Sequence, residues 1–204
     1  MKRLFINKGI SLVETLIVVT IVSFLVLAIG SFQRNILFFA GFLEDSISGA
    51  QDARAVLRTM ACEIRTASPS NLGTYPVATA SPQTFTFYSD IDDDGLKERV
   101  RYFLDGVDLK KGIVKPSGNP LMYDPASETV VAVLVHNVRN DAQNIFDYYD
   151  TNYDGTTDPL PEPIDIISAR LVKITIIIDA DPNRAPSAKT FTSQVSMRNL
   201  KDNL

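Results

Sequence analysis

Residues 10–29 read ISLVETLIVVTIVSFLVLAI, and this stretch decides how the chain is interpreted. As a helix, an apolar segment of this length crosses the hydrocarbon core of a bilayer, so the stretch is predicted to span a membrane. Its one ionisable side chain is Glu14. A carboxylate at the centre of a span costs roughly 2.5–3.5 kcal/mol on insertion scales, and less near an end, where Glu14 lies. Glu14 is therefore a candidate functional residue for which a charged partner is expected.

The residues before the span are basic. Lys2, Arg3 and Lys8 occur there without any acidic side chain, which predicts that this end stays in the cytoplasm and that the rest of the chain is exported. An ordinary secretory signal has a shorter apolar core and a small-residue cleavage site, and neither is found here. The remaining alternatives are an uncleaved signal anchor and an anchor processed in another way.

The stretch KGISLVETLIVVTIVSFLVLAI resembles the N-terminus of type IV prepilins and type II secretion pseudopilins. In that family a basic leader ends in Gly, a membrane peptidase cleaves after it on the cytoplasmic side, and the fifth mature residue is Glu. The resemblance implies that Gly9 ends the leader, that Ile10 becomes the N-methylated first residue, and that Glu14 is the fifth. The family favours Phe or Met at the first mature position, so Ile10 is a departure.

Such processing explains the carboxylate physically. Cleavage leaves a free amine on Ile10, and in a filament this amine can pair with Glu14 of a neighbouring subunit. Opposite charges attract strongly in apolar surroundings, whereas either charge alone bears the cost of desolvation. The pair would therefore set the stagger between subunits.

Composition limits the rest of the chain. With 204 residues and 45% hydrophobic content, the chain accommodates the anchor and one globular domain. Removing the three leader cations changes the formal net charge from −4 to −7, which argues against nucleic acid as a partner. The single cysteine, Cys62, precludes an internal disulfide and is expected to be a small apolar filler.

Helical periodicity continues beyond the span to about Thr66, with an apolar stripe that includes Leu57 and Ile64. This pattern predicts one helix with a membrane half and an amphipathic half that lies on a sheet. The expected division is a leader, the membrane half of the helix, its amphipathic half, a connecting loop and a β-rich globular domain, over residues 1–9, 10–30, 31–67, 68–83 and 84–204.

After the connecting loop the hydrophobic period changes to two, which is typical of strands. Strands are predicted at residues 84–88, 99–104, 129–138, 169–179 and 191–197. The clearest is 169–179, where apolar and polar residues alternate. The predicted fold class is α+β: a pilin-like long N-terminal helix packed on an antiparallel β-sheet domain.

Two acidic loops have the pattern D-x-[DN]-x-D-G, in which alternate oxygen-bearing side chains converge around a turn made possible by Gly. Calcium is the ion that this pattern favours, as a structural cofactor. The candidate ligands are Asp90, Asp92, Asp94 and Glu98 in the first loop, and Asp150, Asn152, Asp154 and Asp158 in the second.

Neither loop completes the EF-hand pattern, because Arg101 and Pro161 occupy the position of the bidentate Glu. Asp94-Gly95 in the first loop is also explained by the need for a hairpin turn. The second loop has no such requirement, so it is the preferred calcium site.

No catalytic constellation is recognisable, and the chain is not expected to be an enzyme. The single histidine, His136, falls in a strand-like apolar run, where a core or edge position is expected.

The stretches DIDDDGLKERVRYFL, YYDTNYDG and TSQVSMRNL resemble J-type minor pseudopilins and W-type minor pilins. This resemblance implies a low-copy subunit of the initiating tip, with I- and K-type minor subunits, the prepilin peptidase and the inner-membrane assembly platform as partners. It further implies a single-pass protein of the inner membrane whose C-terminal domain is exported to the periplasm or cell surface before it joins the filament. The alternative is a membrane-anchored calcium-dependent binding domain that does not polymerise. The machine that the chain serves is left open among secretion, motility, adhesion and DNA uptake.

Overall fold

The computed structural model describes residues 11–179 and 188–200, and the chain divides into two units, Met1–Asp45 and Ser46–Leu204. Helix α1 runs from Leu12 to Arg65, which confirms the predicted long helix and its end. Gly9 and Ile10 lie outside the described residues.

The first unit contains the apolar part of α1. By length and composition, Leu12–Arg34 can cross a membrane: its mean hydropathy is 2.7 and none of its most apolar window is buried. The predicted span therefore corresponds to one N-terminal helix that is long and apolar enough to cross a membrane.

The second unit begins with the amphipathic part of α1. The predicted stripe is buried over Ala53, Leu57, Met60 and Ile64. Arg54 and Arg58 lie on the exposed side of the same helix. Because buried residues recur every three or four positions, this part of α1 presents one apolar face to the sheets.

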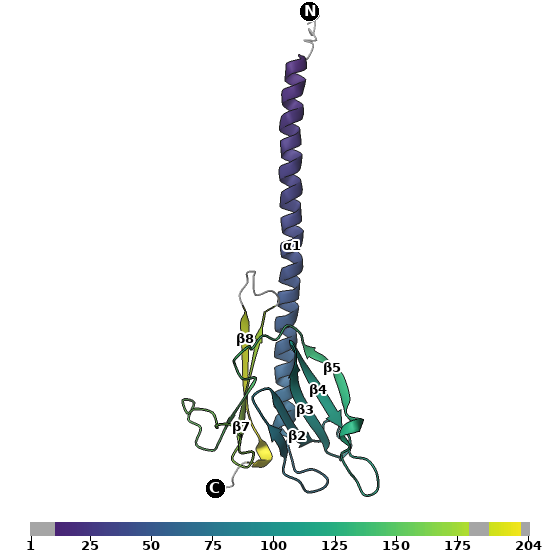
Figure 1. Cartoon of the computed structure of the whole chain (residues 1–204), viewed down its shortest axis with the longest axis vertical. Helices are drawn as coiled ribbons and strands as arrows, with labels where there is room; N and C mark the ends of the chain where they lie inside the picture. Colours follow the sequence, from purple (N-terminus) through teal and green to yellow (C-terminus); the bar gives the residue numbers. More distant parts are fainter. Residues whose placement is uncertain (1–10, 180–187, 201–204) are drawn as a thin grey trace, which may run out of the picture. The chain divides into compact units, whose positions relative to one another are not determined.

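Two antiparallel sheets follow, where one was expected (Figure 1). The larger has the order β1-β2-β3-β4-β5, so each strand pairs with its neighbour in sequence. Its strands are Val77–Ala80, Thr84–Ser89, Glu98–Asp105, Asp108–Val114 and Thr129–Val135. The smaller sheet has the order β6-β7-β8, formed by Phe146–Tyr149, Leu171–Ile178 and Lys189–Ser196. Two 3-10 turns, Pro125–Ser127 and Arg198–Leu200, complete the regular structure of the described residues.

One hydrophobic core joins the helix and both sheets. Phe85 of β2 packs against Phe146 and Tyr148 of β6, with ring centroids 5.9 and 5.6 Å apart. In β7, every second residue is buried, as the alternation predicted. Buried side chains from α1, β2, β3 and β7 belong to this one core. They include Met60, Ile64, Phe85, Phe87, Val100, Tyr102, Val172, Ile174 and Ile176.

Several local expectations are wrong. The segment expected to be a connecting loop, 68–83, contains β1, and β4 and β6 were not predicted. Cys62 is exposed and does not fill the core. His136 directly follows the edge strand β5 and is exposed, so the core position considered for it is wrong. Its Nδ1 lies 3.0 Å from Oδ1 of Asp108.

Candidate functional site

Hydroxyl groups in the apolar part of α1 are satisfied within the helix. The hydroxyls of Thr15, Thr20 and Ser23 donate to the carbonyl oxygens of Leu12, Leu16 and Val19, at 2.7–2.8 Å. A hydroxyl bonded in this way can lie in lipid without an unpaired donor.

Glu14 differs from these residues. It lies in the first turn of α1, where the partial positive charge of the helix N-terminus is favourable for a carboxylate. That effect is worth about 0.3–1 kcal/mol, which is less than the roughly 2.5–3.5 kcal/mol cost of a carboxylate deep in a span. No group among the described residues forms a hydrogen bond or ion pair with Glu14. The charged partner expected for Glu14 is therefore not found in the described part of the chain.

The first acidic loop, residues 90–97, connects β2 to β3. The strand register pairs Ser89 with Glu98, so the hairpin closes on a long loop and not on a two-residue turn at Asp94-Gly95. Gly95 has φ +88°, which a side chain would disfavour. The positive φ therefore explains Gly95, but a hairpin turn explains neither Asp90 nor Asp92.

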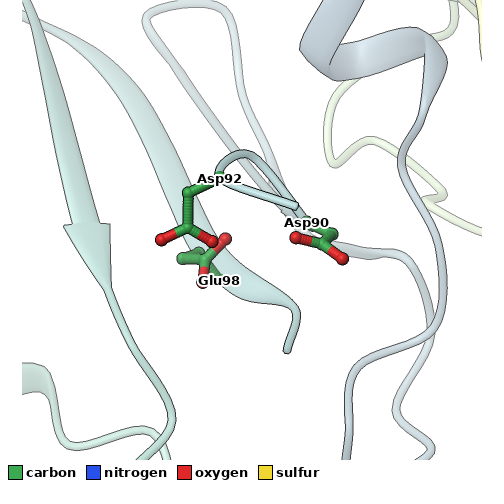
Figure 2. A group of neighbouring side chains, drawn as sticks. All are labelled: Asp90, Asp92 and Glu98. Carbon is green, nitrogen blue, oxygen red and sulfur yellow. The ribbon is translucent and has the colours of Figure 1, made fainter. Parts of the chain in front are cut away.

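The loop brings three predicted ligands together. One carboxylate oxygen from each of Asp90, Asp92 and Glu98 lies within 4.8 Å of the other two, and we call this set the acidic cluster. Figure 2 shows the carboxylates of Asp92 and Glu98 facing one another, with that of Asp90 beside them. It is the one such group of three acidic, histidine or cysteine side chains in residues 11–179 and 188–200.

Glu98 is the most buried member, with 0% of its surface exposed. Its Oε2 accepts a hydrogen bond from the backbone N–H of Ile91 at 3.0 Å, whereas no group within the described part of the chain donates to the buried Oε1. Burial raises the pKa of Glu98, because desolvation disfavours the charged form. Glu98 is thus a carboxylate with one unsatisfied oxygen inside the cluster.

Asp90 repeats this feature. Its Oδ2 accepts from the N–H of Gly95 at 3.1 Å and lies 3.4 Å from Nζ of Lys97. Its Oδ1 is buried and has no hydrogen-bond donor among the described groups. Two members of the acidic cluster, Asp90 and Glu98, therefore each have an unsatisfied buried carboxylate oxygen.

Lys115, just after β4, is the cation on the exposed side of the cluster. Its ammonium group pairs with Oδ2 of Asp92 and lies 3.4 Å from Oδ2 of Asp94. The hydrogen bond from Lys115 lowers the pKa of Asp92. One oxygen of Asp94 accepts a hydrogen bond from the N–H of Leu96 at 2.8 Å, and the other lies near Lys115. Asp94 is not a member of the acidic cluster.

Neighbouring segments hold the loop in place. Oδ1 of Asn71 accepts from the N–H of Lys97 at 2.6 Å, and the hydroxyl of Tyr123 donates to the carbonyl of Lys97 at 2.7 Å. The Tyr123 ring packs against Tyr88 of β2, with centroids 5.1 Å apart. The loop is therefore held by two residues distant in the sequence, Asn71 and Tyr123, and Tyr88 packs against the second of them.

The second acidic loop has a different arrangement. One oxygen of Asp154 accepts four hydrogen bonds, from the N–H and hydroxyl groups of Thr156 and Thr157, at 2.8–3.0 Å. These hydrogen bonds, first the one from the backbone N–H of Thr156 and then the one from the hydroxyl of Thr157, lower the pKa of Asp154. Asp150 accepts from the backbone and side-chain amide of Asn152. With Asp158 these acidic residues form no cluster like that of the first loop, although all of them are described.

Sequence reasoning missed Lys115 and the burial of Glu98. The β3–β4 register pairs Arg99 with Val114, which places Lys115 one position further, beside Glu98. Recognising β4 in DLKKGIV would have given this neighbour, because hairpin pairing fixes all later partners.

A scan against models of known protein families and a search of curated proteins find no match for this sequence.

Proposed function

We propose that this chain is a minor pilin or pseudopilin, a structural subunit of a type IV pilus or a type II secretion pseudopilus. The observation that carries the proposal is Glu14. It is an acidic residue five positions after Gly9, in a helix long and apolar enough to cross a membrane, and it has no partner among the described residues.

Assembly supplies the missing partner. After cleavage, the amine of Ile10 in one subunit pairs with Glu14 of its neighbour. The hydroxyl groups of the same span are already satisfied within α1, so Glu14 is the polar group there that needs another chain.

The later segments support a minor subunit of the initiating tip. In this proposal the I- and K-type minor subunits and the inner-membrane assembly platform are partners, and the prepilin peptidase acts first. The exported unit, with its helix face on two antiparallel sheets, has the general α+β organisation expected for a pilin-like domain.

The test is incorporation into filaments in the source organism. Glu14→Ala removes the charge and slightly favours residence in lipid. We expect membrane insertion and leader cleavage to persist, while the amount of the chain in sheared filaments or in the cross-linked tip complex falls at least about tenfold. Such a loss corresponds to about 1.4 kcal/mol or more of assembly free energy.

Thr15→Val is the matched control. It changes the next polar residue in the same turn, whose hydroxyl already bonds to Leu12. We expect this variant to enter filaments like the parent. Equal incorporation of the Glu14→Ala chain would show that Glu14 does not guide assembly.

The second candidate function is a membrane-anchored calcium-dependent binding domain that does not polymerise. The observation that favours this alternative is the acidic cluster, whose three carboxylates could hold a metal ion. A parent chain that is absent from filaments and tip complexes, in cells that assemble them, would support this candidate over the first.

A further inference from the structure

We propose that Asp90, Asp92 and Glu98 form a calcium site, and that Lys115 occupies part of this site when calcium is absent and is displaced when calcium binds. Two independent observations carry the inference: the convergence of three carboxylates and the unsatisfied buried oxygen of Glu98.

The convergence of three carboxylates does not by itself indicate a metal site, since acidic loops on a protein surface are often only hydrated. Glu98 does not fit that alternative, because it is fully buried. A buried polar atom that lacks a partner costs about 1–3 kcal/mol, and more for a charged group. A cation held by oxygens of Asp90, Asp92 and Glu98 would bring a positive charge to the two carboxylates that each have an unsatisfied buried oxygen.

The donor set indicates the class of metal. All three side chains offer carboxylate oxygen, and no histidine or cysteine belongs to the cluster. Hard cations prefer such ligands, and calcium accepts six to eight oxygens in irregular geometry. Magnesium requires a near-ideal octahedron, which fits less well with a loop whose ligands come from one strand end and one irregular segment.

Lys115 explains how the acidic cluster is stabilised without metal. Its ammonium reaches Asp92 and Asp94 at the exposed side, where more than half of the Lys115 side chain is accessible. The ammonium neutralises the outer carboxylates but reaches neither unsatisfied inner oxygen. Calcium and the Lys115 ammonium therefore compete for Asp92, and this competition sets the apparent affinity.

The main experiment uses the full chain in detergent, first treated with chelator and then titrated with calcium chloride. Isothermal titration calorimetry should show one saturable site, and the melting temperature should rise with calcium because the ion binds the folded state. Magnesium chloride, titrated in parallel, should give a smaller shift at equal concentration. The absence of any saturable calcium binding, or a larger shift with magnesium, would overturn the proposal.

Variants assign the site within the chain. Glu98→Gln should weaken calcium binding by at least about tenfold, because even the loss of a group behind a ligand costs about 10–100-fold. If the Glu98→Gln chain does not fold, Asp92→Asn replaces it, because Asp92 is exposed and its substitution should weaken calcium binding without unfolding the chain. The double variant Asp150→Asn, Asp154→Asn is the matched control in the second loop and should retain the parent affinity. A calcium effect lost only in this control would place the site in the second loop.

The competition is tested with Lys115→Gln. Removing the ammonium should tighten calcium binding several-fold. Lys110→Gln is the control, because Lys110 makes a comparable exposed ion pair with Asp105, at 2.6 Å. Unchanged or weaker binding in the Lys115→Gln chain would show that Lys115 does not compete. The inference does not depend on filament assembly, so its failure would leave the proposed function in place.

Discussion

Glu63, near the end of α1, accepts a hydrogen bond from the hydroxyl of Tyr102 in β3 at 2.5 Å. Nζ of Lys111 in β4 lies 2.7 Å from the other oxygen of the same carboxylate. Both Tyr102 and Lys111 are buried. Desolvation, followed by the nearby Glu63 charge, raises the pKa of Tyr102. One carboxylate of the helix therefore joins two adjacent strands of the larger sheet.

Glu63→Gln should destabilise the second unit, Ser46–Leu204. The substitution leaves the Lys111 ammonium buried without its counter-ion, and breaking such a pair costs about 3–5 kcal/mol. We expect a decrease of about 3 kcal/mol in the free energy of unfolding, measured by chemical denaturation of the full chain in detergent. Asp52→Asn, on the exposed side of the same helix, should change it by less than about 0.5 kcal/mol. Equal stability of the two variants would contradict this role for Glu63.

The Arg101–Glu128 pair should contribute to the dependence of stability on pH. Arg101 of β3 donates two hydrogen bonds to Glu128, at 2.9 and 2.5 Å, and this contact lowers the pKa of Glu128. A depressed pKa means that the stabilisation is fully present above the ordinary pKa of 4.5 and is lost as the pH falls through the lower folded-state value. Between pH 7 and pH 3, Glu128→Gln should therefore lose less stability than the parent. Parallel acid titration curves for the two chains would show that the pair does not contribute.

Gly112 of β4 allows the Glu128 side chain to lie across the strand. A Cβ at position 112 would be 2.7 Å from Cδ of Glu128, so Gly112→Ala must move this side chain away from Arg101. We expect a loss of about 1–2 kcal/mol in the free energy of unfolding, since charge-assisted hydrogen bonds are worth about 1.5–3 kcal/mol and Arg101 is partly exposed.

A double-mutant cycle isolates the cause of that loss. With Glu128→Ala already present, Gly112→Ala meets no carboxylate, and the alanine should be neutral or stabilising by about 0.5–1 kcal/mol because Gly is unfavourable in a strand. The same loss in both backgrounds would mean that the alanine acts elsewhere in β4.

The parts of the fold that were predicted correctly are those where burial is periodic. Helix α1 was recognised because its apolar positions recur at helical spacing, and β7 because Val172, Ile174 and Ile176 alternate with Lys173 and Thr175. Strand β4 was missed because Lys110 and Lys111 interrupt the apolar pattern. Lys110 pairs with Asp105 across the β3–β4 turn, and Lys111 pairs with Glu63 of α1, 48 residues away, which no local pattern reveals.

The acidic loops show the same limit at the candidate site. The spacing of the oxygen-bearing residues identified both loops, including Glu98 at the ninth position. Ranking the loops required the burial of Glu98 and the hydrogen bonds that occupy Asp154, and both depend on the folded chain. The preference for the second loop rested on a two-residue hairpin turn in the first, and the strand register does not contain this turn.

The most direct test of the proposed function is the intact mass of the chain purified from membranes of cells that contain a prepilin peptidase. The proposal predicts a mass that corresponds to a chain starting at Ile10 with one added methyl group. Gly9→Leu, which blocks the approach of the peptidase to the cleavage site, should leave the leader attached. A parent chain that still begins at Met1 in the presence of an active peptidase would contradict the assignment to the pilin class.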